Sequence, residues 1–162
     1  MKQYVLGFVF DEVYKRVLLI KKLRPDWQKG NLNGIGGKVE EKETPFEAMI
    51  RECQEETSVL TKKEDWSVYC LMDGRSCPDG DWIIHCFYGI AQQMGIPTYE
   101  FKQNEEEFVD WHYLDRINSV NTPNLLGNIP WLVTLALDFW KNGNIAPPTF
   151  YYTGGFSLPL NI

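Results

Sequence analysis

Glu52, Glu55 and Glu56 are the residues whose spacing most directly predicts chemistry. At about 100° per residue, the second and third lie about −60° and +40° from the first, so a helix would carry all three carboxylates on one face. Like charges at this spacing repel, at a cost of roughly a few tenths of a kcal/mol per pair. A divalent cation reverses that cost, and oxygen-only ligands favour Mg²⁺, Mn²⁺ or Ca²⁺ over zinc. The alternative interpretation is an ordinary solvated acidic helix face.

The three glutamates belong to a larger pattern of fixed spacings. Its members are Gly37, Glu43 after five intervening residues, Arg51 and Glu52 after seven more, and Glu55 with Glu56 after one apolar and one unconstrained position. Six fixed identities at these spacings arise by chance in about 10⁻⁵ of chains of this length at average amino-acid frequencies. The whole pattern is therefore a much stronger signal than the trio alone.

This pattern resembles the signature of the Nudix hydrolases, G-x5-E-x7-R-E-U-x-E-E-x-G-U, in which U is bulky and aliphatic. The chain matches it from Gly37 to Val59, as GKVEEKETPFEAMIRECQEETSV. Two positions depart from it, because Cys53 fills the first U and Ser58 replaces the last glycine. Cysteine behaves as a small hydrophobic residue, so the first change is mild. A glycine after a helix supplies a left-handed residue, so we expect Ser58 to strain or redraw that turn.

The resemblance implies a role for each charged position. The implied metal ligands are the Gly36 carbonyl and the carboxylates of Glu52, Glu55, Glu56 and Glu106. Arg51 is expected to pair with Glu43 and orient the helix. The implied cofactor is Mg²⁺, with Mn²⁺ as a substitute, and it would polarise the substrate and lower the pKa of a bound water. Glu52 and Glu106 are both candidates for the carboxylate that takes the water's proton.

Further similarity covers most of the chain and points to the branch that hydrolyses purine nucleoside triphosphates, oxidised ones included. It rests on Lys21, Lys22, the stretch NGIGGKVE at 33–40, Glu106 five residues before Trp111, and the helix that includes Pro130 and Trp131. It implies that Asn33 contacts the base and that Lys22, Gly37 and Lys38 contact the substrate. Lys38 would hold a phosphate oxygen as a point charge, and its alternative is a plain surface lysine.

The segment 118–128 differs from that branch at the positions that read the base. The branch carries an acidic pair there, whereas this chain has Asn121 and Asn124. This weakens the transfer of a preference for oxidised guanine. An asparagine side chain both donates and accepts hydrogen bonds, so a purine is still readable there.

The expected reaction is Mg²⁺-dependent hydrolysis of a nucleoside triphosphate to a monophosphate and pyrophosphate, with oxidised purine deoxynucleotides among the candidate substrates. A second hypothesis is a Nudix enzyme for another diphosphate, such as ADP-ribose, a sugar nucleotide or capped RNA. A third is a non-catalytic nucleotide-binding module on the same fold. The short chain and the stretch around Asn33 favour the triphosphate. The intact Arg51, Glu52, Glu55 and Glu56 favour catalysis.

Charge along the chain is uneven. The 162 residues carry a formal charge of −6, but 40–56 carries −5, 100–110 carries −4, and the rest carries +3. The acidity argues against a double-stranded nucleic-acid partner, which needs a basic face. We expect a nucleotide-binding monomer or homodimer that does not bind membranes.

Length and composition predict one cytoplasmic domain over residues 1–162. The N-terminus lacks a signal-peptide pattern and no apolar run approaches the ~18–20 residues that span a bilayer. The four cysteines contain no C-x-x-C pair, so we expect reduced thiols rather than a zinc site.

Local patterns predict mostly sheet with two helices. The first helix runs from Pro45, behind an N-cap at Thr44 and with a capping-box Glu47, to about Thr57. The second covers 129–141. The predicted strands cover 4–10, 17–22, 65–74, 81–92, 108–114 and, at an edge, 149–152. Residues 24–37 are expected to form a loop that ends in a glycine cluster. This order predicts an α+β fold, an α/β/α sandwich with a mixed central sheet, which is the Nudix fold that the resemblance implies.

Overall fold

The computed structural model describes residues 1–13, 15–23, 29–75, 80–99, 101, 107–117, 124–143 and 146–152, with residue 107 as backbone only. Its strands are β1 (Lys2–Asp11), β2 (Arg16–Lys22), β3 (Leu32–Asn33), β4 (Ile35–Lys38), β5 (Ser67–Asp73), β6 (Trp82–Ile90), β7 (Glu107–Tyr113) and β8 (Thr149–Tyr151). Its helices are α1 (Pro45–Thr57), a 3₁₀ turn η1 (Lys63–Asp65), α2 (Ala91–Met94), α3 (Leu114–Ile117) and α4 (Ile129–Asn142).

The strands form one mixed sheet in the order β3-β2-β1-β6-β5-β8. β1 pairs in parallel with β6 and antiparallel with β2 and β4. β4 and β2 share one edge of β1, because β4 lies opposite Tyr4–Gly7 and β2 opposite Val9–Asp11. β7 then pairs antiparallel with the outer side of β2. This shared edge brings the end of β2 close to β4, which carries two of the predicted site glycines.

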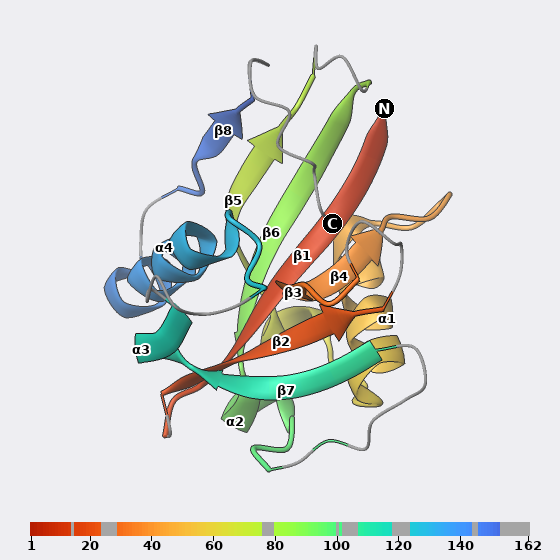
Figure 1. Ribbon diagram of the computed structural model, residues 1–162. Helices are drawn as coiled ribbons and strands as arrows, with labels where there is room; N and C mark the ends of the chain where they lie inside the picture. The colour runs from red at the N-terminus through yellow and green to blue at the C-terminus, as the bar shows by residue number, and fades with distance from the viewer. Residues whose placement is uncertain are drawn as a thin grey trace.

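The two long helices cover opposite faces of the sheet (Figure 1). On one face α1 buries Ala48, Met49 and Cys53 against alternate residues of β1 and β2, such as Val5 and Ile20. On the other face α4 packs with a core that shares no member with the first; its fully or nearly fully buried helix residues are Ile129, Leu132, Val133 and Ala136. The fold is therefore the predicted α+β sandwich, with a separate apolar layer on each side of the sheet.

Several predicted boundaries are wrong. Asp65 lies in η1 rather than in a strand, and its carboxylate accepts the Lys62 N–H at 2.8 Å. Gln92 belongs to α2, which ends at the left-handed Gly95, with φ of 70°. Gly74 lies outside β5, and Leu114 opens α3. The expected loop at 24–37 contains β3 and β4, and 24–28 lies outside the described residues.

The two long helices and the edge strand are confirmed. Residues 45–57 and 129–142 are helical, and β8 is an edge strand that pairs in parallel with β5. Cys53, Cys70 and Cys86 are buried free thiols, and Cys77 lies outside the described residues. Within the described ranges, every helix is too short or too polar to cross a membrane.

Candidate active site

Helix α1 starts and stops where its own residues specify. The Thr44 Oγ1 accepts the Glu47 N–H at 3.3 Å, and the Glu47 carboxylate accepts the Thr44 N–H at 2.8 Å, which completes the capping box. The helix ends at Ser58, which adopts the left-handed conformation with φ of 61°. Serine therefore takes the backbone conformation that the signature glycine normally supplies, at the steric cost of a Cβ.

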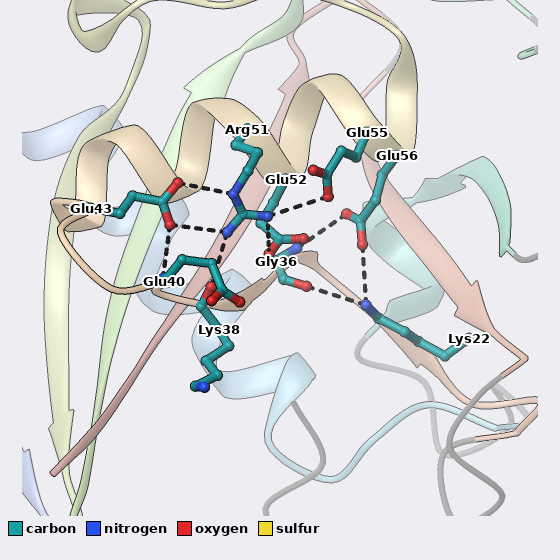
Figure 2. A network of polar contacts seen from close by, with 9 residues as sticks. All are labelled: Lys22, Gly36, Lys38, Glu40, Glu43, Arg51, Glu52, Glu55 and Glu56. Carbon is teal, nitrogen blue, oxygen red and sulfur yellow. Dashed lines mark hydrogen bonds and ion pairs between the residues drawn. The ribbon is translucent and has the colours of Figure 1, made fainter.

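The buried face of α1 fixes the rotation of the helix. Met49 and Cys53 are fully buried, and Phe46 and Ile50 pack against the same core. Cys53 packs as a small apolar core residue, as expected for this departure from the signature. Its burial raises the pKa of its thiol to about 11. With this face fixed, the signature carboxylates are directed toward β4 and the end of β2 (Figure 2).

Arg51 joins the helix to the loop that precedes it (Figure 2). Its Nε and Nη2 donate to the two Glu43 oxygens at 2.9 and 3.1 Å, so the pair is bidentate. Nη2 also donates to the Lys38 carbonyl at 3.0 Å. The Glu40 N–H donates to Glu43 at 2.9 Å, so Glu43 is held from both sides. The bond from Arg51 is the main reason that the pKa of Glu43 lies below its ordinary value.

The same guanidinium contacts two further carboxylates. Arg51 Nη1 donates to Glu52 Oε1 at 2.7 Å and to Glu55 Oε2 at 3.3 Å. The Glu55 side chain is 59% exposed, whereas that of Glu52 is 13% exposed. Burial raises the pKa of Glu52 despite the opposing effect of Arg51. A Cβ at Gly37 would overlap the Glu52 carboxylate, so any larger residue there would displace that carboxylate from its present place.

Glu56 is the most enclosed of the three glutamates. Its Oε2 accepts the Gly36 N–H at 3.1 Å, and its Oε1 accepts a hydrogen bond from Lys22 Nζ at 3.1 Å. Lys22 Nζ also donates to the Gly36 carbonyl at 3.2 Å. Gly36 has φ of 152°, and a Cβ there would overlap the Val5 carbonyl. The Gly36 backbone therefore packs closely against β1 while its N–H donates to Glu56.

The remaining predicted residues lie around this centre. Asn33 is buried, and its Oδ1 accepts the Gly34 N–H at 2.9 Å. Lys38 is exposed, and its ammonium points away from the carboxylates (Figure 2). Glu106 and Asn121 lie outside the described residues. Asn124 is left-handed, with φ of 64°, and its carbonyl accepts the Leu32 N–H at 2.7 Å. The chain thus brings the segment after 123 beside the one that carries Asn33.

Two features of the site were missed by sequence reasoning. The pattern predicts the Arg51–Glu43 pair but not that Arg51 also holds Glu52, Glu55 and the Lys38 carbonyl. Nor does it predict that Lys22, 34 positions before Glu56, bonds to that glutamate. Spacing within a helix carries no information about a partner on a distant strand, so no local signal marks this contact.

The donor set suits a hard divalent cation. Gly36, Glu52, Glu55 and Glu56 offer only oxygen, the ligand type that Mg²⁺ and Mn²⁺ prefer. The oxygens of Gly36 and Glu56 both accept hydrogen bonds from the Lys22 ammonium. Those of Glu52 and Glu55 both accept hydrogen bonds from the Arg51 guanidinium. Among the described residues, no three Asp, Glu, His or Cys side chains gather at one point as a metal site.

Comparison with known proteins identifies the family of the chain. The family model of the NUDIX domain matches residues 2–132. The chain therefore belongs to the Nudix hydrolase family, and its mixed sheet between helices is the Nudix fold. No curated protein matches the sequence.

Solved structures share the fold at low sequence identity. A MutT/nudix family protein from Enterococcus faecalis has a TM-score of 0.67 and 15% identity over 87% of this chain, which spans only 62% of that protein. The MutT protein from Bacillus halodurans has a TM-score of 0.62 and 22% identity, with 98% and 95% of the two chains covered. The NUDIX domain of Shewanella oneidensis NrtR, complexed with ADP ribose, has a TM-score of 0.65 and 18% identity, with 85% and 87% covered.

Proposed function

We propose that the protein is a Mg²⁺-dependent pyrophosphohydrolase that converts a nucleoside triphosphate to a monophosphate and pyrophosphate. The observation that carries the proposal is the arrangement around α1, where Arg51 and Lys22 hold Glu52, Glu55, Glu56 and the Gly36 carbonyl on one side of the helix. Glu55 and Glu56, with Glu52, would ligate the ion together with the Gly36 carbonyl. Glu106 is proposed as a further ligand.

The chemistry needs a cation beside the acidic face. A polyphosphate is repelled by uncompensated carboxylates, and a bound divalent ion neutralises it, polarises phosphorus and acidifies a water molecule. The bond between the first phosphate and the pyrophosphate breaks when water adds to phosphorus. Glu52 is our candidate to accept the water's proton, because it is held between Gly37 and Arg51. Arg51 and Glu43 position the helix, and Lys38 is proposed to hold a phosphate oxygen.

A purine is the base that we propose. Asn33 is buried beside the segment that contains Asn124, because Leu32 bonds to the Asn124 carbonyl. The stretch NGIGGKVE at 33–40, which resembles the purine triphosphate branch, supports this choice. Because the acidic pair of the oxidised-purine branch is missing, we propose an amide-based contact with the base.

A second candidate substrate is ADP-ribose. It rests on the complex of the NrtR domain with that ligand at a TM-score of 0.65. That complex also shows a domain of this fold with a bound nucleotide, which is the part of the third hypothesis that concerns binding.

A panel of nucleotides with Mg²⁺ separates these candidates. The panel contains the four triphosphates, oxidised purine triphosphates, ADP-ribose, a sugar nucleotide and capped RNA, and the products are quantified by chromatography. We expect pyrophosphate release from a purine triphosphate. Tight binding without turnover of any member would support the binding module instead.

The role of Glu52 is tested by Glu52→Gln on the best substrate. The variant should remain folded, because glutamine retains an acceptor for Arg51, and kcat should fall about 10³-fold or more. Glu106→Gln, measured in parallel, tests the rival base. An unchanged kcat in Glu52→Gln would exclude Glu52 as the base.

A further inference from the structure

Lys22 occupies a position between two proposed metal ligands. Its Nζ lies 3.2 Å from the Gly36 carbonyl oxygen and 3.1 Å from Glu56 Oε1 (Figure 2). The side chains of Lys22 and Glu56 are only 12% and 5% exposed. The ammonium therefore neutralises a buried carboxylate through contacts that are mostly shielded from water.

An ammonium and a divalent cation make the same demand on these oxygens. Both are hard cations that are stabilised where a carbonyl dipole and a carboxylate converge, as they do around Lys22 Nζ. Two positive centres that share these two acceptors would repel each other strongly at such a short separation. Lys22 and a divalent ion are therefore competitors for Gly36 and Glu56.

We infer that Lys22 is an internal counter-cation that must leave Gly36 and Glu56 before a divalent ion is bound there, so that this lysine sets the metal affinity of the site. The inference rests on the proposed metal-dependent function. Without the ion, Lys22 keeps Glu56 paired and the Gly36 backbone of β4 held beside α1. With the ion, the Lys22 ammonium is released at the end of β2, beside the acidic face where an anionic substrate would dock.

The side chain of Lys22 is suited to this exchange. It stands on the last residue of β2, so its long stem can turn while the strand stays paired. The preceding residue, Lys21, is exposed and points to the other face of the strand. Lys21 therefore carries the same charge at the neighbouring position of β2 but does not contact Gly36 or Glu56, which makes it the matched control.

The first test measures Mn²⁺ binding by the electron paramagnetic resonance signal of the free ion. Lys22→Met removes the competing charge and keeps the length of the stem, so we expect Mn²⁺ to bind at least tenfold more tightly than to the wild type. Lys21→Met should change the affinity less than threefold. In the absence of metal, Lys22→Met should melt at a lower temperature, because Glu56 loses the charge of the Lys22 ammonium. Mn²⁺ should raise the melting temperature of this variant more than that of the wild type.

The outcomes separate the two proposals. If the wild type binds no Mn²⁺, the metal-dependent function fails, and the inference with it. If the wild type binds Mn²⁺ but Lys22→Met binds it equally or more weakly, only the exchange is wrong, and Lys22 supports metal binding instead.

A second test uses the wild-type chain, so it does not depend on the folding of a variant. Reductive methylation of lysines, followed by mass spectrometry of the peptides, reports how accessible each amine is. We expect saturating Mg²⁺ to raise the methylation rate of Lys22 at least threefold and to leave that of Lys21 unchanged. A Lys22 rate that stays constant or falls when Mg²⁺ binds would overturn the inference.

Discussion

The bidentate pair between Arg51 and Glu43 offers a sharp test of how the site is held together. Glu43→Gln removes the negative charge and keeps the shape and one acceptor oxygen. The pair connects the loop before α1 to the middle of that helix, so the change should weaken the attachment of the loop. We expect a loss of global stability that depends on pH.

The magnitude follows from the exposure of the pair. A hydrogen bond to a charged group contributes about 1.5–3 kcal/mol, whereas a solvent-exposed ion pair contributes about 0–1 kcal/mol. The Glu43 side chain is 14% exposed, but that of Arg51 is 30% exposed, which places the pair between these limits. Arg51 also keeps its bonds to Glu52 and the Lys38 carbonyl. We therefore expect Glu43→Gln to lower the free energy of unfolding by about 1 kcal/mol at pH 7.

The dependence on pH has a definite sign. The folded-state pKa of Glu43 lies below its ordinary value of 4.5, chiefly because of the bond from Arg51. Its contribution to stability is therefore present above pH 4.5 and is lost as the pH falls through the lowered pKa. The difference between the wild type and Glu43→Gln should shrink steadily below pH 4.5.

Urea unfolding followed by tryptophan fluorescence measures the difference. At an m-value of about 2 kcal/mol/M, a loss of about 1 kcal/mol shifts the midpoint by about 0.5 M. Glu41→Gln is the control, because Glu41 is an exposed carboxylate in the same loop and should leave the midpoint almost unchanged. Equal midpoints for Glu43→Gln and the wild type at pH 7, or a difference as large at pH 3.5, would refute the reasoning.

Three further predictions concern the helix and its glycine neighbour. Ser58→Gly should raise the free energy of unfolding by about 0.5–1 kcal/mol, and Tm by about 1–4 °C in a thermal melt, because glycine adopts φ of 61° without the penalty of a Cβ. Gly37→Ala should lower kcat at least tenfold at nearly unchanged circular dichroism, because the new Cβ displaces the Glu52 carboxylate; normal activity would contradict this account. Cys53 should react with a thiol reagent at pH 8 at least ~100-fold more slowly in the folded chain than in urea, since its pKa of about 11 lies two units above the ordinary value of 9.0 and the thiol is buried.

Sequence reasoning predicts features whose causes are local. The limits of α1 were predictable because Thr44, Pro45 and Glu47 form its start within four residues, and the spacing of its apolar residues fixes its buried face. The strands β3 and β4 could not be predicted, because they are only two and four residues long. β3 forms by pairing with β2, and β4 forms by pairing with β1. The sequence predicts a strand through Gln92, because the apolar run of β6 continues into Ala91 without a turn signal.

The same distinction applies to the site. The Arg51–Glu43 pair could be predicted from the resemblance, since both residues belong to one motif. The bonds that Lys22 makes to Gly36 and Glu56 join β2, β4 and α1, and they depend on β2 and β4 sharing one edge of β1. No property of the residues near Lys22 in the sequence specifies that edge.

The charges of the site explain why these long-range contacts matter for function. Glu43, Glu52, Glu55 and Glu56 contribute four negative charges, and Arg51 and Lys22 return only two. The folded chain thus balances half of the charge of its own motif with fixed cations. One divalent ion supplies the other half, and if it also displaces Lys22, the released ammonium adds a positive charge at the place where a polyphosphate must approach. Metal occupancy would then remove the net negative charge of the site and increase the number of cations available to the substrate.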